Sequence, residues 1–382
     1  MTESAVDAGG DREGACIAYV VGARPNYVKM APLIAAMREA LPAARHVLIN
    51  TGQHYDPVLS SLFLEVLGMP DPDHELEVGS GSHAVQVARV IERIEPVLIA
   101  ETPDVVVVPG DVNSTLAAAI VASRLGIGVV HLEAGLRSFD RSMPEEVNRI
   151  LVDRISDLLL VHSPEAIDNL VAEGIEAGRV RMVGNTMIDS LVAVREQVAQ
   201  VDAAGRLGVE PGSYLLVTLH RPALVDGPLL EAAIAGLGAV AREMPVVFPV
   251  HPRTRARLDA SGTPDGVIAC DPLGYLEFLS LQSTARAVLT DSGGVQEETT
   301  FLGVPCFTLR DNTERPVTIS VGSNVLLGLD PAEIETITDR LATWDRECGV
   351  PEHWDGRASV RAAREIASFL DQPEVARAGG VG

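Results

Sequence analysis

The chain has 382 residues, of which 47% are hydrophobic and 22% charged, a composition typical of a folded protein with more than one hydrophobic core. Its formal charge of −23 argues against nucleic acid as a partner, and no apolar run approaches the ~20 residues that would span a membrane. The four cysteines are widely spaced and no pair has the spacing of a metal site, so we expect a reduced, cytoplasmic protein without a metal.

Strand-like and helix-like segments alternate along the first half of the chain. Continuous apolar runs predict strands at 16–21, 46–50, 105–108, 129–133, 158–161 and 180–183. Amphipathic stretches between them predict helices, among others at 30–40, 83–100, 114–125 and 145–154. Because strands that are buried on both faces read as apolar runs, this series indicates a parallel, doubly wound sheet.

The series restarts in the second half, after a predicted helix at 184–202 and a connection at 203–211. Further strands are predicted at 215–219, 246–250, 267–270, 287–290 and 305–309. We therefore expect an α/β protein with two Rossmann-like, doubly wound domains that face a cleft. The predicted parts are a flexible tail (1–14), the first domain (15–187), the second domain (188–355), a C-terminal helix that could pack back on the first domain (356–372) and a second tail (373–382).

The strand at 287–290 ends in the sequence Asp-Ser-Gly-Gly and passes straight into helix-forming residues. Two glycines, Gly293 and Gly294, let the backbone approach a ligand closely, and the free amides of the helix start favour an anion. Ordinary capping by Asp291 or Ser292 is the simpler alternative. A second charged turn, which contains Arg315, follows the next apolar run. Together the two turns predict a phosphate-bearing ligand at the carboxyl edge of a parallel sheet.

Lys29 is the only lysine in the chain, and it follows the first strand together with Arg24. A cation near the start of a helix disfavours that helix, so we interpret Lys29 as a phosphate contact beside Arg24. A surface lysine without a special role is the alternative.

Several acids follow strands or begin helices in the first domain. Asp111 follows one apolar strand, Glu133 ends the next, where it shares a face with His131, and Glu145 opens a helix. Each acid also has a simpler alternative role: Asp111 could cap a helix, Glu133 could be a solvated strand end, and Glu145 could interact with the dipole of its helix. Their common position at one edge of the sheet favours a functional role. His220 follows a strand of the second domain and faces the predicted cleft.

Three common motifs are absent from the sequence. It contains no G-x-G-x-x-G after a strand, no G-x-x-x-x-G-K-[ST] and no G-x-S-x-G. These absences argue against a dinucleotide cofactor, P-loop hydrolysis of ATP and an α/β-hydrolase, so no cofactor is expected.

A series of motifs in fixed order resembles the bacterial non-hydrolysing UDP-N-acetylglucosamine 2-epimerases. They are GARPNYVKMAPL, TGQHYD, PGDVNSTLAA, HLEAGLRSFDRSMPEEVNR, VGNTMIDSL, TLHRP, TDSGGVQEE and RDNTERP. The resemblance extends from about residue 16 to 370 and implies two Rossmann-like domains arranged as in GT-B glycosyltransferases. The segments Arg221-Pro222-Ala223 and Gly79-Ser80-Gly81-Ser82-His83 and the residue Leu273 depart from the family pattern.

By this resemblance, four residues match catalytic positions of the family: Asp111, Glu133, Glu145 and His220. Eight residues match its nucleotide-sugar site: Arg24, Lys29, Phe278, Ser292, Gly293, Gly294, Glu298 and Arg315. The implied reaction converts UDP-N-acetylglucosamine to UDP-N-acetylmannosamine through 2-acetamidoglucal and UDP, in a homodimer. A related UDP-2-acetamido sugar, a hydrolysing 2-epimerase that releases free N-acetylmannosamine, a GT-B glycosyltransferase and a non-catalytic nucleotide-sugar sensor remain alternatives.

Overall fold

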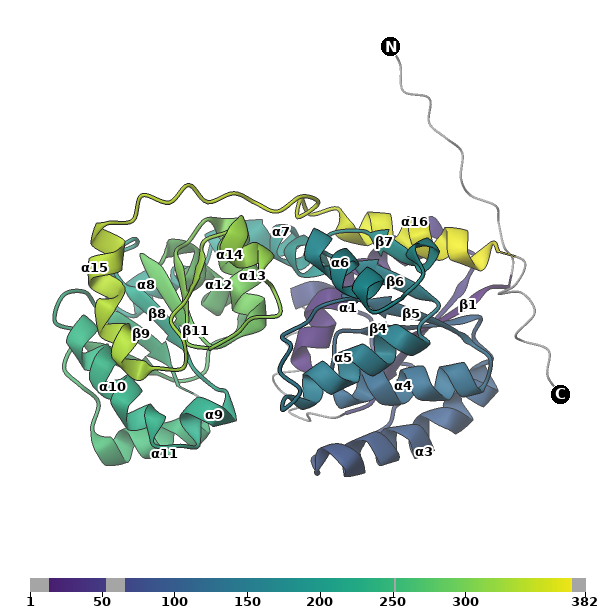
Figure 1. Ribbon diagram of the computed structural model, residues 1–382, viewed down its shortest axis with the longest axis horizontal. Helices are drawn as coiled ribbons and strands as arrows, with labels where there is room; N and C mark the ends of the chain where they lie inside the picture. Colours follow the sequence, from purple (N-terminus) through teal and green to yellow (C-terminus); the bar gives the residue numbers. More distant parts are fainter. Residues whose placement is uncertain (1–13, 53–65, 251, 373–382) are drawn as a thin grey trace, which may run out of the picture. The chain divides into compact units, whose positions relative to one another are not determined.

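The computed structural model describes residues 14–52, 66–250 and 252–372 and divides into two compact units (Figure 1). Unit 1 comprises Met1–Ser190 and Asp355–Gly382, and unit 2 comprises Leu191–Trp354. The predicted tails lie outside the described residues, apart from Gly14, and so does most of the TGQHYD motif. No helix in the described part of the chain is long and apolar enough to cross a membrane.

Unit 1 is built on a parallel sheet of seven strands in the order β3-β2-β1-β4-β5-β6-β7. The strands are β1 (Cys16–Val21), β2 (Arg45–Asn50), β3 (His74–Glu75), β4 (Val105–Pro109), β5 (Gly128–Leu132), β6 (Leu158–Val161) and β7 (Val180–Met182). The order reverses between β1 and β4, which makes the carboxyl ends of these two strands the place where such sheets bind ligands. Only β3, a polar strand of two residues, was missed among these strands.

Helices cover both faces of this sheet. They are α1 (Arg24–Ala40), α3 (His83–Glu101), α4 (Asn113–Arg124), α5 (Pro144–Ile155), α6 (Pro164–Ala172) and α16 (Ala358–Leu370), with a 3-10 turn at Ala177–Arg179. Helix α7 (Thr186–Ala199) begins in unit 1 and ends in unit 2. Alternate residues of β1 and β4 enter two cores: Ile17 and Val105 pack with α1 and α16, whereas Ala18 and Val106 pack with α3 and α4. The burial of both faces explains why these strands read as unbroken apolar runs.

The C-terminal helix α16 belongs to unit 1. Ile366 and Phe369 enter the core that α1 covers. The start of α16 is capped from α7, where the Asp189 carboxylate accepts hydrogen bonds from Ala358 N (3.1 Å) and Ser359 N (2.6 Å). This capping satisfies amides that the first turn of a helix leaves open.

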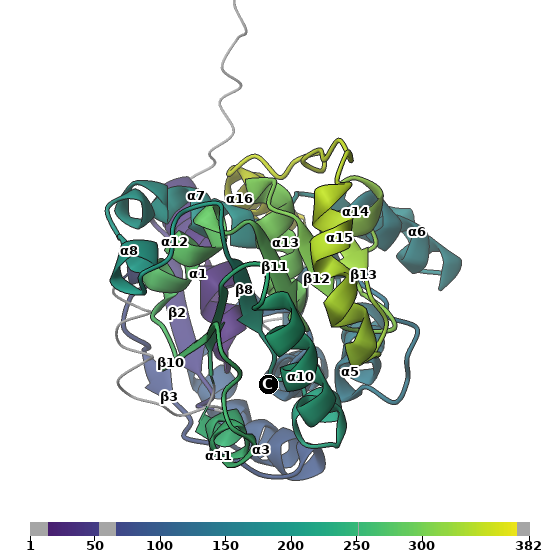
Figure 2. The same cartoon turned by 90° about the vertical axis from the view of Figure 1, so that its left-hand side faces the viewer.

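Unit 2 repeats the plan with six parallel strands in the order β10-β9-β8-β11-β12-β13 (Figure 2). The strands are β8 (Leu215–Thr218), β9 (Val246–Pro249), β10 (Val267–Cys270), β11 (Ala287–Thr290), β12 (Cys306–Thr308) and β13 (Asn324–Leu326). The helices are α8 (Ala203–Arg206), α9 (Pro222–Val225), α10 (Leu229–Val240), α11 (Pro252–Ser261), α12 (Tyr275–Thr284), α13 (Gly293–Leu302), α14 (Val317–Ser320) and α15 (Ile337–Ala342), with a 3-10 helix at Pro331–Thr336. The order reverses between β8 and β11.

Two parallel, doubly wound sheets confirm the predicted fold class. Two details of unit 2 differ from the expectation, and the first is that strand β13 was not predicted. The segment 203–211 was predicted as a connection, but it begins with helix α8, whose Ala203 and Ala204 are buried in a core of unit 2. Small residues in a polar setting suggested a linker, and only the tertiary packing shows their burial.

Candidate active site

The carboxyl edge of the unit 1 sheet is closely packed where the strand order reverses. A Cβ on Gly22, which follows β1, would lie 2.4 Å from Ser114 Oγ and 2.5 Å from Thr51 Oγ1, so only glycine fits there. The side chain of Asn26 accepts hydrogen bonds from Gly22 N (3.0 Å) and Ala23 N (3.1 Å) and thereby fixes the turn that leads into α1. Helix α1 consequently begins at Arg24, six residues earlier than predicted.

Gly110, directly after β4, is the centre of this edge. Its φ of +62° lies in the left-handed region, which favours glycine. A Cβ there would lie 3.1 Å from the carboxylate oxygen Oε2 of Glu133 and 3.2 Å from Lys29 Nζ. Gly110 therefore lies next to two of the predicted site residues and leads directly to a third, Asp111.

Glu133 directly follows β5 and has a φ of +70°, which is uncommon for a residue with a side chain. Such a conformation costs roughly 1–3 kcal/mol and persists where the surrounding structure enforces it. Its side chain forms a buried ion pair with Lys29, and the two residues are 8% and 6% exposed. Glu133 is thus no solvated strand end, and Lys29 is no surface lysine. The two residues also line a cavity of about 10 Å³, which is room for roughly one water molecule.

Lys29 was predicted to contact a phosphate, but in this structure its ammonium contacts a carboxylate. Arg24, predicted beside it, is exposed at the first residue of α1. The two cations therefore differ in burial and in surroundings, and only Lys29 is buried among the acids of unit 1.

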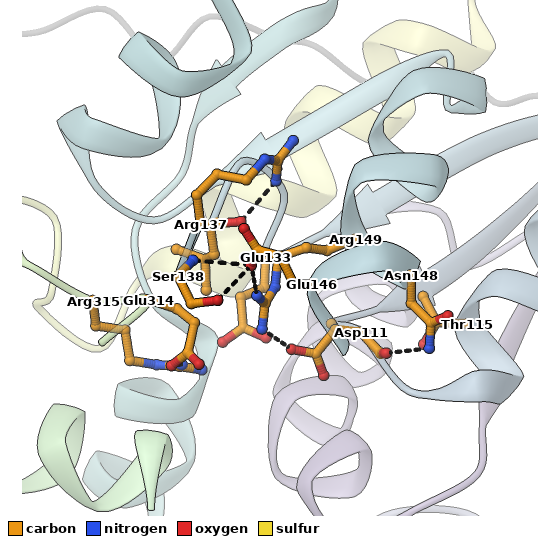
Figure 3. Close-up of polar contacts among 12 residues, drawn as sticks. Asp111, Thr115, Glu133, Arg137, Ser138, Glu146, Asn148, Arg149, Glu314 and Arg315 are labelled. Atoms are coloured by element: carbon orange, nitrogen blue, oxygen red, sulfur yellow. Dashed lines mark hydrogen bonds and ion pairs between the residues drawn. The ribbon is translucent and has the colours of Figure 1, made fainter. Parts of the chain in front are cut away.

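Asp111 pairs with an arginine instead of capping helix α4, whose N-cap is Val112. The guanidinium of Arg149 donates from Nη2 to Asp111 Oδ2 at 2.5 Å, and its Nη1 pairs with the buried carboxylate of Glu146 (Figure 3). Asn148 Nδ2 donates to the backbone oxygen of Asp111 at 2.9 Å. One turn of α5 thus holds both the side chain and the backbone of Asp111.

Glu146 is the better anchored of the two neighbouring acids that open α5. It is 1% exposed and accepts hydrogen bonds from the backbone and hydroxyl of Ser138 and from Phe139 N, each at 2.9 Å (Figure 3). Glu145, the predicted site residue, is only half-buried. The sequence analysis missed Glu146 and Arg149, and a signal was available: on a helix, positions 146 and 149 share a face.

In unit 2, Asp291 follows β11 and organises the predicted histidine. Its carboxylate accepts from the backbone amides of His220 and Arg221, both at 2.8 Å, and lies 3.0 Å from His220 Nδ1. Burial alone would raise the pKa of Asp291, but the contacts with His220 and Arg221 outweigh it and lower the pKa below its usual value. The imidazole of His220 is itself half-exposed.

Helix α13 begins at the Ser-Gly-Gly turn, and neither predicted cap is used there. The N-cap Ser292 makes no capping bond with its side chain in the described structure, and the carboxylate of Asp291 binds the segment after β8. A Cβ on Gly293 would lie 2.6 Å from Arg315 Nη1, because the guanidinium rests against this turn. Amides, a helix N-terminus and a guanidinium therefore meet at one place, which suits an anion.

Buried acids hold Arg315 in that position. Its Nε donates to Glu297 Oε1 at 2.7 Å and its Nη1 to Glu314 Oε2 at 3.2 Å. Gln296 on α13 donates a hydrogen bond to Ser292 O at 3.2 Å and accepts one from Thr313 Oγ1 at 2.7 Å. It therefore connects the glycine turn to the segment that contains Arg315.

The remaining predicted residues of unit 2 are Phe278 on α12 and Glu298 on α13. Phe278 is half-buried and packs against the core that contains Val295. Glu298 is 5% exposed, and burial raises the pKa of its carboxyl from 4.5 to about 8. A neutral carboxyl at this position could donate a hydrogen bond as well as accept one.

The structure thus brings the predicted residues together in two groups. The first lies at the carboxyl edge of unit 1 and holds Lys29, Asp111, Glu133 and, half-buried on α5, Glu145. The second lies at the carboxyl edge of unit 2 and holds His220, the Ser292–Gly294 turn and Arg315. Chemically, the first group offers carboxylates that can move protons, and the second offers amides and cations that can bind an anion.

Comparison with known proteins identifies the family. A family model described as UDP-N-acetylglucosamine 2-epimerase matches residues 37–367. A Methanococcus maripaludis protein named UDP-N-acetylglucosamine 2-epimerase is 40% identical over 351 residues, which cover 89% of this chain and 93% of that protein. A Pseudomonas aeruginosa protein named UDP-2,3-diacetamido-2,3-dideoxy-D-glucuronate 2-epimerase is 41% identical over 359 residues, or 92% of this chain and 99% of that protein.

A solved structure supports the same assignment. The crystal structure of Methanocaldococcus jannaschii UDP-GlcNAc 2-epimerase in complex with UDP-GlcNAc and UDP matches with a TM-score of 0.85 at 38% identity. The match covers 92% of this chain and 99% of that chain. The resemblance noted in the sequence motifs is confirmed, and the chain belongs to the UDP-N-acetylglucosamine 2-epimerase family.

Proposed function

We propose that the protein converts UDP-N-acetylglucosamine to UDP-N-acetylmannosamine without hydrolysis, by eliminating UDP and adding it back to the sugar. The observation that supports this most directly is the meeting of Asp111 and Glu133 around Gly110, at the carboxyl edge where ligands of such sheets bind. A chain that served only to bind a nucleotide sugar would have no need of two acids at this edge.

The chemistry explains why acids and cations are both needed. The C2 proton of the sugar is not next to a carbonyl, so a carboxylate alone removes it too slowly. As the C1–O bond to UDP breaks, the ring gains oxocarbenium character and the C2 proton becomes acidic. Loss of this proton forms the C1=C2 double bond of 2-acetamidoglucal, and UDP leaves with the electron pair of the C1–O bond. A proton delivered to the opposite face of C2, with return of the UDP oxygen to C1, gives the epimer. The route is redox-neutral and needs no nicotinamide.

The residues of unit 1 are proposed to move the proton. Asp111 and Glu133 act as base and acid on the two faces of C2, with Glu145 as a third acidic group of the site. Arg149 orients Asp111, and Lys29 orients Glu133. Carboxylates of this kind also balance the positive charge that develops on the ring.

The residues of unit 2 are proposed to bind the diphosphate as it departs. The amides of the Ser292–Gly294 turn and the guanidinium of Arg315 stabilise the growing negative charge. His220 lies at the same edge as a further acid or phosphate contact. Arg24, Phe278 and Glu298 complete the proposed nucleotide-sugar site, with Phe278 near the uracil.

One experiment separates the proposal from its rivals. The protein is incubated with UDP-N-acetylglucosamine in deuterated water, without an acceptor, and the products are followed by 1H and 31P NMR. We expect UDP-N-acetylmannosamine with deuterium at C2. Free N-acetylmannosamine with UDP would indicate the hydrolysing reaction, and a substrate without deuterium would reject epimerisation of this sugar and leave a glycosyltransferase as the alternative.

The sugar itself is the least constrained part of the proposal. The Pseudomonas aeruginosa relative, which is 41% identical, is named for a diacetamido glucuronate. A related UDP-2-acetamido sugar is therefore the alternative substrate, and the deuterium experiment is repeated with it.

Two further expectations concern the setting of the enzyme. The four cysteines are free thiols, which supports the proposed reducing, cytoplasmic location. A homodimer is proposed from the family resemblance, and light scattering at several protein concentrations tests it.

A further inference from the structure

A fully buried histidine lies beneath the acids of unit 1. His131 is two residues before Glu133 on β5 and is 0% exposed. Its Nδ1 lies 2.7 Å from Asp153 Oδ1 and its Nε2 lies 2.8 Å from the backbone oxygen of Gly110. The ring therefore bridges α5 to the residue around which Asp111 and Glu133 meet.

The partner of Nε2 determines that this ring nitrogen of His131 carries a proton. A carbonyl oxygen can only accept, so Nε2 must donate to Gly110 O. The carboxylate of Asp153 also accepts from Arg137 Nη1 (2.7 Å) and from Gly135 N (3.2 Å). Nδ1 of His131 lies against the other oxygen of this carboxylate, so both ring nitrogens have a polar partner.

The buried carboxylate of Asp153 beside this ring is paired with a buried cation, Arg137. Arg137 contacts Asp153 on one side and forms two 2.7 Å hydrogen bonds with Glu173 on the other. His131, Asp153, Arg137 and Glu173 thus form one continuous chain of polar contacts. Such pairing is what allows charges to stay in an interior that excludes water.

We propose that His131 is a positioning residue for the reaction, which holds the Gly110 peptide so that Asp111 and Glu133 keep their working geometry. This inference rests on the proposed function, because it assumes that these two acids act on the sugar.

Two features of Gly110 explain why its hydrogen bond with His131 would affect the positions of both acids. Its left-handed φ of +62° sets the direction in which the chain continues into Asp111. Its Cα also faces the Lys29–Glu133 pair closely enough that a Cβ would lie 3.1 Å from Glu133 Oε2. A rotation of this one peptide would therefore displace both acids. A misplacement of about 1 Å in a catalytic group can cost ~10²-fold in rate.

Two substitutions separate the two hydrogen bonds of the ring. The amide of a glutamine reaches about as far as Nε2, so His131→Gln retains a donor toward Gly110 O. The amide of an asparagine reaches only as far as Nδ1, so His131→Asn retains a donor toward Asp153 and loses Gly110. In both variants Arg137 still pairs with Asp153, so neither leaves that carboxylate buried without a cation.

The measurements are kcat and KM for the epimerisation, UDP affinity and the melting temperature. We expect His131→Asn to lower kcat about 100-fold with UDP affinity and melting temperature close to those of the parent, and His131→Gln to restore most of the rate. A folded His131→Asn within threefold of the parent, or a folded His131→Gln as slow as His131→Asn, would overturn the inference.

The parent protein supplies a second test that needs no variant. In 15N NMR spectra of histidine-labelled protein, Nε2 of His131 should carry the proton that it donates to Gly110 O, and an unprotonated Nε2 would overturn the inference. If the parent itself fails to place deuterium at C2 of either UDP-sugar, the proposed function fails, and this spectrum still decides how the ring holds Gly110.

Discussion

Lys29 and Glu133 form a buried ion pair, although 104 residues separate them in the sequence. Lys29 lies in the second turn of α1 and Glu133 directly after β5, so the pair joins the two sides of the place where the strand order reverses. The only lysine of the chain thus meets an acid proposed to act on the substrate. Buried charges next to an active site often hold a catalytic side chain in place.

Replacing Lys29 by methionine should destabilise the fold by about 3–5 kcal/mol, because the buried carboxylate of Glu133 loses the ammonium of Lys29. Urea denaturation measures the free energy of unfolding. The double variant Lys29→Met/Glu133→Gln should recover most of that stability and still fail to epimerise. A single Lys29→Met variant as stable as the parent would contradict the importance of the pair.

Asp111→Asn and Glu133→Gln should lower turnover by ~10²–10⁴-fold, the usual loss when an acid–base group is removed. Asp111→Asn should keep the melting temperature of the parent, since Arg149 retains its contact with Glu146. The rate of deuterium incorporation in deuterated water measures the turnover of both variants, and thermal denaturation measures the melting temperature. The exposed Glu92 on α3 provides the control, because Glu92→Gln removes a carboxylate without touching the site. Either acid variant with a rate near that of the parent would reject its assignment.

The sequence alone predicted the strands of both sheets well, because residues buried on both faces must be apolar. It missed β3 (His74–Glu75) and β13 (Asn324–Leu326), which lie at sheet edges and span only two and three residues. Hydrophobic pattern carries little information at that length.

The site was predictable in part, for a related physical reason. Asp111, Glu133 and Ser292 follow buried strands, and the ends of parallel strands meet at one edge. The partners of these residues were not predictable, since Arg149 and Arg315 pair across long sequence separations that no local pattern records. The choice between Glu145 and Glu146 also required the structure, because it depends on which way the first turn of α5 faces the core.

Gly293→Ala should weaken UDP binding by about 10–100-fold, because the added Cβ would lie 2.6 Å from Arg315 Nη1 and displace a charged donor. Arg315→Ala should produce a loss of similar size by removing that donor. Calorimetric titration with UDP measures both. Gly178→Ala is the matched control, since a Cβ there meets nothing within 4 Å. Unchanged affinity in the first two variants would place the diphosphate elsewhere.

The buried carboxyl of Glu298 should make the fold less stable as pH rises. Burial raises its pKa from 4.5 to about 8, with Glu297 adding to the rise against an opposing contact from Gln282. The unfolded chain releases this proton near the ordinary value, so between the two pKa values the native state binds more protons than the unfolded state. The stability contributed by neutral Glu298 is therefore complete below the unfolded pKa and is lost as the pH rises through the folded pKa.

Replacing Glu298 by glutamine should remove this dependence, because an amide has no proton to lose. Urea midpoints at about pH 5 and about pH 8 give the change in stability for each protein, and the parent should lose more than Glu298→Gln over that interval. Comparing the two proteins cancels the contributions of all other titratable groups. Glu210 is exposed in the same unit, so the Glu210→Gln control should show the pH dependence of the parent. Equal pH dependence in the parent and Glu298→Gln would mean that Glu298 is ionised in the folded protein, and its proposed contact with the nucleotide sugar would then be that of an acceptor alone.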